Sequence, residues 1–156
     1  QGDIRFVEAL AEMGCQVNYQ ANGISVTGPA RQGVKIDMAD ISDTAQTLAI
    51  VALFVEGPTH ITGVAHNRVK ETDRIGNLAI ELRKLGAEVD EQDDGLIIQP
   101  PTRIEPATIE TYRDHRMAMS FALVGLKQQG IQILDPGCVD KTFPDYFQTL
   151  TGVVGH

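Results

Sequence analysis

The chain has 156 residues, of which 42% are hydrophobic and 22% charged, so it is long and apolar enough for one domain with a hydrophobic core. Thirteen Lys and Arg against twenty-one Asp and Glu give a net charge of −8, which argues against nucleic acid or a membrane surface as the main partner and requires any anion site to be local. The longest apolar stretch, "TLAIVALFVEG", is too short to span a bilayer.

The first predicted elements are an amphipathic helix and a β-hairpin. The helix "DIRFVEALAEMG" ends at Gly14, as expected for a glycine C-cap, and two alternating runs then flank a tight turn at Asn22-Gly23. The same pattern recurs 72 residues later, where "LRKLGAEVDEQDDGLIIQPP" aligns with "LAEMGCQVNYQANGISVTGP" and supplies Gly86 and the turn Asp94-Gly95. The chain therefore contains an internal repeat.

A second repeated segment follows each of these hairpins. At an offset of 73, "VKIDMADISDTAQTLAIVALFVEG" aligns with "ATIETYRDHRMAMSFALVGLKQQG", and both read as strand, loop and helix. The two helices are apolar almost all round, which predicts that they are buried on every side. Each is followed by another strand, "THITGV" or "IQIL".

Together these elements predict an α/β fold built from repeated βαβαββ units with buried parallel helices. One complete unit spans about residues 35 to 101, and partial units span about 1 to 29 and 107 to 156. The first partial unit lacks its strands and buried helix, and the last lacks its hairpin. We interpret the chain as a piece of a longer protein, the alternative being a natural domain with ragged ends.

Six basic residues stand in loops or first turns before predicted helices. The helix dipole already presents positive charge there, so these cations are unfavourably placed unless an anion binds among them. Arg83 and Lys84, by contrast, lie in the last turn of a helix, where cations are favourable. Any one of the six could be a solvated surface charge or an i,i+3 partner, as Arg74 could be for Glu71. We expect a shared anion site from Arg68, Lys70, Arg74, Arg113, Arg116 and Lys141.

The two loops before the buried helices carry different chemistry. One contains "ISDTA" and the other "DHRMA", so Asp43 aligns with Arg116, which predicts a site with unlike sides. Part of this loop chemistry is ordinary capping, for which Asp114, Ser42 and a capping box from Thr142 to Asp145 are candidates. His115 is either a structural histidine or a member of the site.

The two cysteines, Cys15 and Cys138, form neither a CxxC pair nor a zinc spacing. We expect ordinary thiols of a reducing compartment, hence a cytoplasmic protein, with a catalytic cysteine as the minor alternative.

Three long segments, "RVKETDRIGNLAIELRKLGAEV", "YRDHRMAMSFAL" and "LDPGCVDKTFPDYF", closely resemble the C-terminal part of the 5-enolpyruvylshikimate-3-phosphate (EPSP) synthase family. The resemblance covers essentially all residues, 1 to 156, and implies an inside-out α/β barrel of two domains. It also implies transfer of the enolpyruvyl group of phosphoenolpyruvate to the 5-hydroxyl of shikimate 3-phosphate, on the way to chorismate, with no metal and no cofactor. Both substrates are anions.

The resemblance also implies roles for individual residues. Asp43 would bind the shikimate hydroxyls and take part in deprotonating the 5-hydroxyl with help from Lys70, while Glu71 would handle the proton at the methylene carbon of phosphoenolpyruvate. His115 would be a supporting group. The carboxylate and phosphate would be held by Arg74, Arg116 and Lys141. Where many members carry Asn in "NWRVKE", this chain has "HNRVKE", so either His66 or Asn67 takes that substrate contact.

The resemblance implies a missing N-terminal domain as partner, without which the fragment alone is expected to be inactive. Two alternatives stay open at this point. The chain could be a non-catalytic anion-binding or structural module that retains the fold. It could also belong to the related UDP-N-acetylglucosamine enolpyruvyl transferases, although "KETDR" and "DHRMAM" favour the shikimate enzyme.

Overall fold

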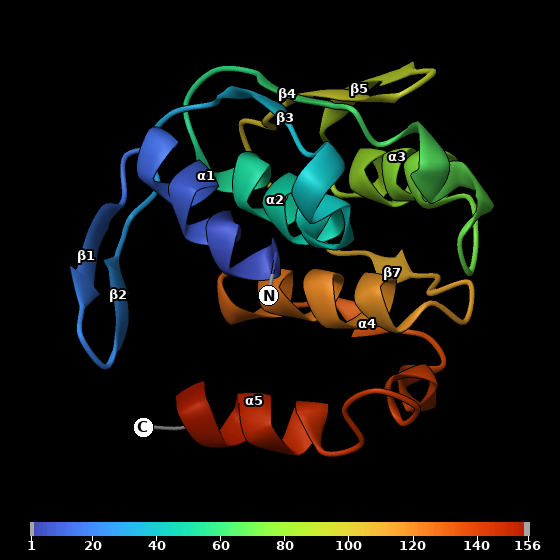
Figure 1. Ribbon diagram of the computed structural model, residues 1–156. Coiled ribbons are helices and arrows are strands. Elements are labelled where there is room, and N and C mark those ends of the chain that lie inside the picture. The colour runs from blue at the N-terminus through green and yellow to red at the C-terminus, as the bar shows by residue number, and fades with distance from the viewer. Residues whose placement is uncertain (1, 155–156) are drawn as a thin grey trace.

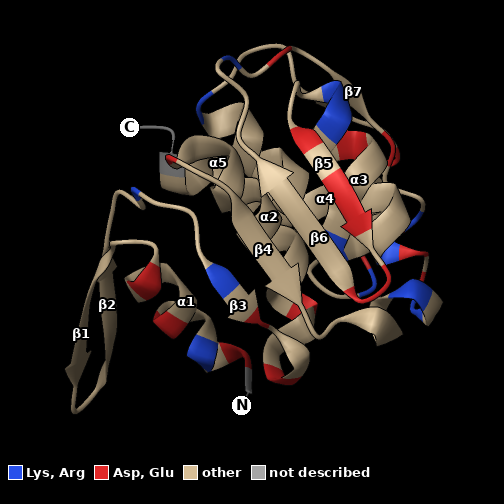
Figure 2. Cartoon of the chain, turned by 90° about the horizontal axis from the view of Figure 1, so that it is seen from above, with Lys and Arg blue, Asp and Glu red and all other residues tan. Residues whose placement is uncertain are grey.

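The computed structural model describes residues 2–154 and has the predicted α/β fold, with the expected order of elements between residues 35 and 101. One four-stranded sheet has the order β3-β4-β6-β5, parallel between β3 and β4 and antiparallel elsewhere. It lies over the helices (Figure 2). Its unit consists of β3 (Lys35–Asp37), the 3-10 segment η2 (Ala39–Thr44), α2 (Ala45–Val51), η3 (Ala52–Phe54), β4 (Thr59–Thr62), η4 (Ala65–Val69), α3 (Arg74–Lys84), β5 (Glu88–Gln92) and β6 (Gly95–Gln99).

The C-terminal part repeats the first half of this order. Strands β7 (Thr108–Ile109) and β8 (Gln132–Ile133) pair in parallel, as β3 and β4 do. Between and after them come α4 (His115–Ala122), η5 (Leu123–Leu126), η6 (Pro136–Val139) and α5 (Tyr146–Val154). Figure 1 shows α4 beneath α2 and α5 at the lower edge of the molecule.

The N-terminal part consists of a helix and a separate hairpin. It contains η1 (Gly2–Arg5), α1 (Phe6–Glu12), β1 (Gln16–Gln20) and β2 (Gly23–Thr27). The hairpin projects from the rest of the chain (Figure 1) and forms its own two-stranded sheet. The predicted turn at Asn22-Gly23 is wrong by one residue, because Gln20 pairs with Gly23 and leaves Ala21-Asn22 as the loop. The prediction of Asp94-Gly95 is displaced in the same way, since Gln92 pairs with Gly95.

The buried helices α2 and α4 run parallel and form the centre of the core. Thr47 Oγ1 and Ser120 Oγ lie 3.1 Å apart, and these residues occupy equivalent positions of the repeat, 73 apart. Asp43 and Arg116, also 73 apart, are in contact at the starts of the same helices. Two contacts with one offset require the helices to run in the same direction. Most side chains of both helices are buried, among them Leu48 and Phe121. The prediction of burial on every side is wrong at the seam between the helices, where Thr47 and Met119 are only half-buried.

Aspartates cap helices α3 and α4. Asp73 accepts from the backbone N–H groups of Ile75 and Gly76 at the start of α3, and Asp114 accepts from that of Arg116 at the start of α4. Within residues 2–154, the capping box expected from Thr142 is not formed, and α5 begins only at Tyr146. No helix in this described stretch is long and apolar enough to cross a membrane.

Candidate active site

The starts of the two buried helices meet at an ion pair. Asp43 lies in η2 before α2, and Arg116 is the second residue of α4. Arg116 donates from Nη2 to Asp43 Oδ2 at 2.7 Å and from Nη1 to the Asp43 carbonyl oxygen at 3.0 Å. The unlike residues at equivalent positions of the repeat are therefore in direct contact.

Arg74, the first residue of α3, lies beneath this pair and joins three carboxylates. Its side chain is only 2% exposed. Nε donates to Asp114 Oδ2 at 2.6 Å, Nη2 donates to Glu71 Oε2 at 2.7 Å, and Nη1 donates to Asp43 Oδ1 at 3.2 Å. A buried guanidinium needs such partners because an unpaired charge is costly in the protein interior.

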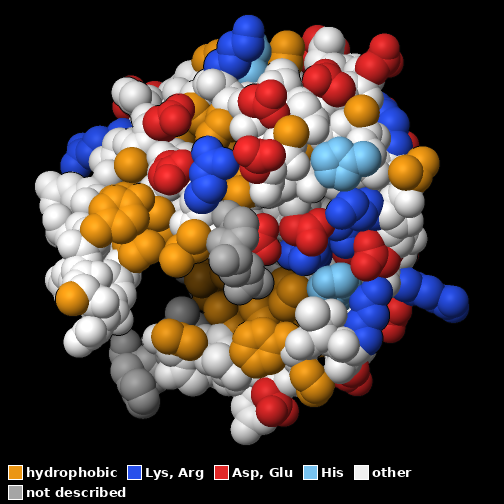
Figure 3. Space-filling model, in the orientation of Figure 1, with side chains coloured by type: hydrophobic (Ala, Val, Ile, Leu, Met, Phe, Trp, Pro, Cys, Tyr) orange, Lys and Arg blue, Asp and Glu red, His pale blue; other side chains and the backbone are white. Residues whose placement is uncertain are grey.

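Two lysines complete the cluster from its solvent side. Lys70 Nζ lies 3.1 Å from Asp43 Oδ1, and Lys141 Nζ lies 3.3 Å from Glu71 Oε1. Lys141 follows η6, so a third part of the chain contributes here. Figure 3 shows charged side chains of both signs gathered on one side of the molecule, beside a hollow lined by hydrophobic side chains. The lysines can therefore reach a ligand from solvent, whereas Arg74 lies beneath them.

The surrounding cations keep both carboxylates of the site ionised. Partial burial of Asp43 opposes ionisation, but the hydrogen bond from Lys70 and the charges of Arg116 and Arg74 outweigh it and lower its pKa. Partial burial also opposes ionisation of Glu71. Its backbone hydrogen bond, Arg74 and Lys141 outweigh burial and lower the pKa of this carboxyl too.

His115 is buried next to the cluster. Burial lowers the pKa of its imidazole and exceeds the opposing effect of Asp114, while Lys141 and Arg116 lower it further. Among residues 2–154 its Nδ1 has no hydrogen-bond partner, and it lies 3.9 Å from Asp114 Oδ1. The ring is therefore held close to the cations as a neutral group at pH 7.

His66 and Asn67 both connect η4 to the loop that carries Asp43. His66 Nε2 lies 2.8 Å from the Ser42 hydroxyl, and Asn67 Nδ2 donates to the Ser42 carbonyl oxygen at 3.0 Å. Ser42, predicted as a possible cap, serves these contacts instead. Asn67 is buried, and its Oδ1 lacks a hydrogen-bond partner in the described part of the chain, whereas His66 is exposed.

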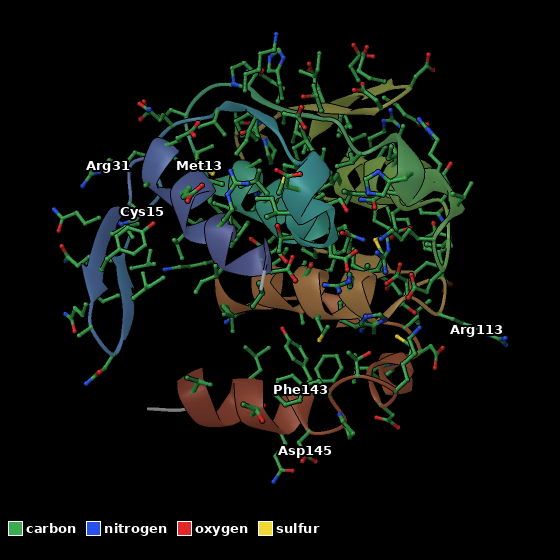
Figure 4. All side chains as sticks on the ribbon, viewed as in Figure 1. Met13, Cys15, Arg31, Arg113, Phe143 and Asp145 are labelled. Atoms are coloured by element: carbon green, nitrogen blue, oxygen red, sulfur yellow. The ribbon has the colours of Figure 1, made fainter. Side chains whose placement is uncertain are left out.

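Two of the six predicted cations lie outside the cluster. Arg68 pairs with Asp73 and Glu91 and donates to the Gln92 and Asp93 carbonyl oxygens, so it joins η4 to the β5–β6 hairpin. Arg113 is exposed and extends away from the helices (Figure 4). The grouping of all six was wrong because sequence position before a helix does not determine which way a side chain points.

A cleft of about 310 Å³ extends from the ion pair along the seam between α2 and α4. It is polar near Asp43 and Arg116 and more apolar toward α5. Its lining consists of Asp43, Thr47, Arg116, Met119, Ser120, Leu123 and Tyr146. In residues 2–154, no group of three or more His, Cys, Asp or Glu side chains is arranged to hold a metal ion.

The fold is that of enolpyruvyl transferases. The solved structure of the enolpyruvyl transferase NikO from Streptomyces tendae matches 96% of this chain with a TM-score of 0.71 at 22% identity, over 35% of its own length. EPSP synthase from Acinetobacter baumannii matches 95% of this chain with a TM-score of 0.82 at 30% identity, over 38% of its own length.

The sequence comparisons then give the family. The chain belongs to the EPSP synthase (3-phosphoshikimate 1-carboxyvinyltransferase) family, whose profile matches residues 1–150. The 3-phosphoshikimate 1-carboxyvinyltransferase of Nostoc punctiforme is 55% identical over 94% of the chain, and the chloroplastic enzyme of Brassica napus is 49% identical over all of it. The chain spans only 34% and 32% of the lengths of these relatives. Both of these relatives are named as 3-phosphoshikimate 1-carboxyvinyltransferases.

Proposed function

We propose that this chain forms one wall of the active site of a transferase that moves the enolpyruvyl group of phosphoenolpyruvate to the 5-hydroxyl of shikimate 3-phosphate. The observation that carries the proposal is the convergence of Lys70, Arg74, Arg116 and Lys141, from three separate parts of the chain, around Asp43 and Glu71. Both substrates are phosphorylated, and phosphoenolpyruvate also carries a carboxylate. Guanidinium forks and lysines are suited to such groups.

Asp43 and Glu71 hold the cations of the site in internal ion pairs. Asp43 and Glu71 accept the hydrogen bonds that a substrate phosphate or carboxylate would accept from Arg116, Lys70 and Lys141. Binding of the anions exchanges internal ion pairs for pairs with the ligand. Arg74 keeps its contacts with Asp43 and Glu71 during this exchange, so neither carboxylate loses every cation.

This exchange also prepares the proton transfers. When Lys141 turns to the ligand and a phosphate approaches Glu71, one of the causes of the lowered Glu71 pKa is removed and a negative charge is added, so the carboxyl can take up a proton. Glu71 then protonates the methylene carbon of phosphoenolpyruvate and later removes a proton as phosphate leaves. Asp43, relieved of Arg116 and Lys70, becomes a better base for the 5-hydroxyl. His115 and the His66–Asn67 segment support the bound substrates.

The opposite wall of the site belongs, in this proposal, to the part of the enzyme that precedes this chain. The chain spans about a third of its relatives' length. Within residues 2–154, β2 presents an unpaired edge near an open apolar groove of about 450 Å³. Pro29, Ala30, Ile50, Val51, Phe54, Leu123, Leu126 and Lys127 line the groove. An N-terminal domain as partner, no turnover by the chain alone, and a cytoplasmic location are parts of the same proposal.

A chimeric enzyme tests the function directly. This chain replaces the aligned third of the Nostoc punctiforme relative, and phosphate release is followed with both substrates present. We expect turnover, and a loss of about 10²-fold or more in kcat for Glu71→Gln and for Asp43→Asn, which remove proton-transfer groups. Arg113→Ala is the matched control and should retain full activity, because this side chain points to solvent. A folded chimera without turnover contradicts the proposal.

The chain by itself distinguishes the enzyme from a simple anion-binding module. Titration with inorganic phosphate should shift the amide resonances of residues 68–74, 114–117 and 140–143, and the shifts should diminish in high salt. Phosphate binding by the chain combined with an inactive chimera would favour the module. Binding together with turnover in the chimera supports the transferase.

A further inference from the structure

Asp114 is buried beneath the site and contacts both arginines that converge there. Its side chain is 0% exposed. Oδ2 accepts from Arg74 Nε at 2.6 Å, and Oδ1 accepts from the Arg116 backbone N–H at 2.8 Å and from Arg74 Nη2 at 3.3 Å. One carboxylate thus connects the first residue of α3 to the first turn of α4. Sequence reasoning had identified Asp114 only as a candidate helix cap.

The backbone before Asp114 adopts an unfavourable conformation that turns this residue inward. Tyr112 and Arg113 have φ values of 53° and 58°, and such left-handed conformations cost energy in residues other than glycine. The Tyr112 hydroxyl donates to the buried Glu81 carboxylate at 2.7 Å, and the Asp114 N–H donates to the Thr111 carbonyl oxygen at 2.8 Å. These contacts hold the turn that delivers Asp114 to Arg74.

A second pair of a capping aspartate and an arginine lies at the surface, outside the site. Asp73 caps α3 and pairs with Arg68 at 3.0 Å, but its side chain is 43% exposed and Arg68 faces the β5–β6 hairpin. Capping alone therefore does not require a buried aspartate. What distinguishes Asp114 is that its arginine also contacts Asp43 and Glu71.

We propose that Asp114 is a positioning residue, which fixes the guanidinium of Arg74 and the helix start that carries Arg116 so that both face the same anion. The inference rests on the proposed anion site, which it deepens. Asp114 does not touch the ligand. It keeps Arg74 in place when the substrate draws Lys141 and Arg116 away from their carboxylates, because the Asp114 pair is closed to solvent and the others are not.

The test uses the whole chain with inorganic phosphate as the probe. Asp114→Asn retains an oxygen to cap α4 but presents N–H groups to Arg74 Nε, so it releases the guanidinium specifically. We expect the exchange of the Arg74 Nε–H proton with water to accelerate about tenfold or more and the dissociation constant for phosphate to rise about tenfold. Asp73→Asn is the matched control: it should weaken the fold by a comparable cap effect and change the phosphate constant less than about twofold.

A double-mutant cycle covers the case in which Asp114→Asn unfolds because the buried Arg74 loses one of its three carboxylate partners. Arg74→Gln removes that cation, and Asp114→Asn in this background should leave phosphate affinity unchanged if Asp114 acts through Arg74. A further loss of affinity in the double variant overturns the proposal. So does an unchanged Arg74 Nε–H exchange rate in Asp114→Asn, or an equal loss of phosphate affinity in Asp73→Asn.

Failure of the proposed anion site has a different signature. If the unsubstituted chain shows no phosphate shifts at residues 68–74, 114–117 and 140–143, the site itself is contradicted. The positioning of Arg74 is then decided by the proton exchange rates alone, where acceleration in Asp114→Asn but not in Asp73→Asn supports it and equal rates contradict it.

Discussion

The hairpins β1–β2 and β5–β6 have the same strand lengths and the same two-residue loop, yet only one is part of the core. β6 pairs with β4, and Ile98 on β6 is fully buried. In the described residues β2 has no second strand beside it, and its Val26 is 39% exposed. Both follow a helix that ends at a left-handed glycine. The local pattern therefore makes the hairpin, and the neighbouring strand decides whether it is buried.

Truncating one apolar side chain in each hairpin should give the largest difference. Ile98→Ala removes buried methyl groups and should lower the free energy of unfolding by about 3 kcal/mol, whereas Val26→Ala should lower it by less than about 1 kcal/mol. Urea unfolding of both variants measures this. Equal losses would mean that β2 is covered as fully as β6 in solution, and the comparison would fail.

The equivalent glycines Gly95 and Gly23 sharpen the comparison. A Cβ at Gly95 would collide with the Ile61 carbonyl oxygen on β4, while a Cβ at Gly23 meets nothing within 4 Å. Gly95→Ala should therefore destabilise the chain by about 2 kcal/mol through overpacking. Gly23→Ala should change its stability by no more than about 0.5 kcal/mol, as expected for an open surface position. Thermal unfolding of the two variants side by side checks this.

A smaller effect is expected where two repeated elements contact each other. Thr47→Val removes one partner of the Thr47–Ser120 hydrogen bond and leaves the buried Ser120 hydroxyl unpaired, at a cost of about 1 kcal/mol. Thr149→Val on the exposed face of α5 is the control. In a cycle with Ser120→Ala the two losses should not add, because one contact is removed twice. Strict additivity would show that the two helices are not coupled through this pair.

The smallest predicted effect depends on pH and concerns His115, the residue that occupies the position of Ser42 in the second copy of the repeat. Because burial lowers the pKa of His115 in the folded chain, the unfolded chain binds a proton first as the pH falls below about 6.5. The free energy of unfolding should therefore decrease from pH 7 toward pH 5, until the folded histidine is protonated too. His115→Gln should flatten this slope. Asp43 and Glu71 change the pH dependence of the free energy of unfolding only at lower pH, since their pKa values are lowered.

Much of the fold followed from local signals that the repeat displayed twice. Gly14 and Gly86 cap helices with φ values of 100° and 93°, as predicted. The predicted positions of the two turns were wrong by one residue, because the prediction placed Gly23 and Gly95 in the loops. Both glycines are the first residue of a strand. Glycine is required at position 95 because β4 approaches closely at Ile61. Ile61 lies 34 residues away in the sequence, so no local signal indicates this contact.

The candidate site was predictable only as far as the repeat reaches. The contact of Asp43 with Arg116 follows from their equivalence, once the two helices lie side by side. Arg68 in η4 and Arg74 at the start of α3 lie close together in the sequence and look alike there. Their contacts differ, because Arg68 pairs with Glu91 on the β5–β6 hairpin and Arg74 pairs with Asp114. The burial of Asp114 results from the packing of the whole chain.

The pairing of Asp43 with Arg116 also bears on how such a site could arise. In two identical copies related by symmetry, this position would face itself, so that two carboxylates or two guanidiniums would repel each other across the seam. Opposite charges can meet there only after the two copies have changed independently of each other. The scaffold could thus be inherited by duplication, but the chemistry of this seam required the loss of symmetry.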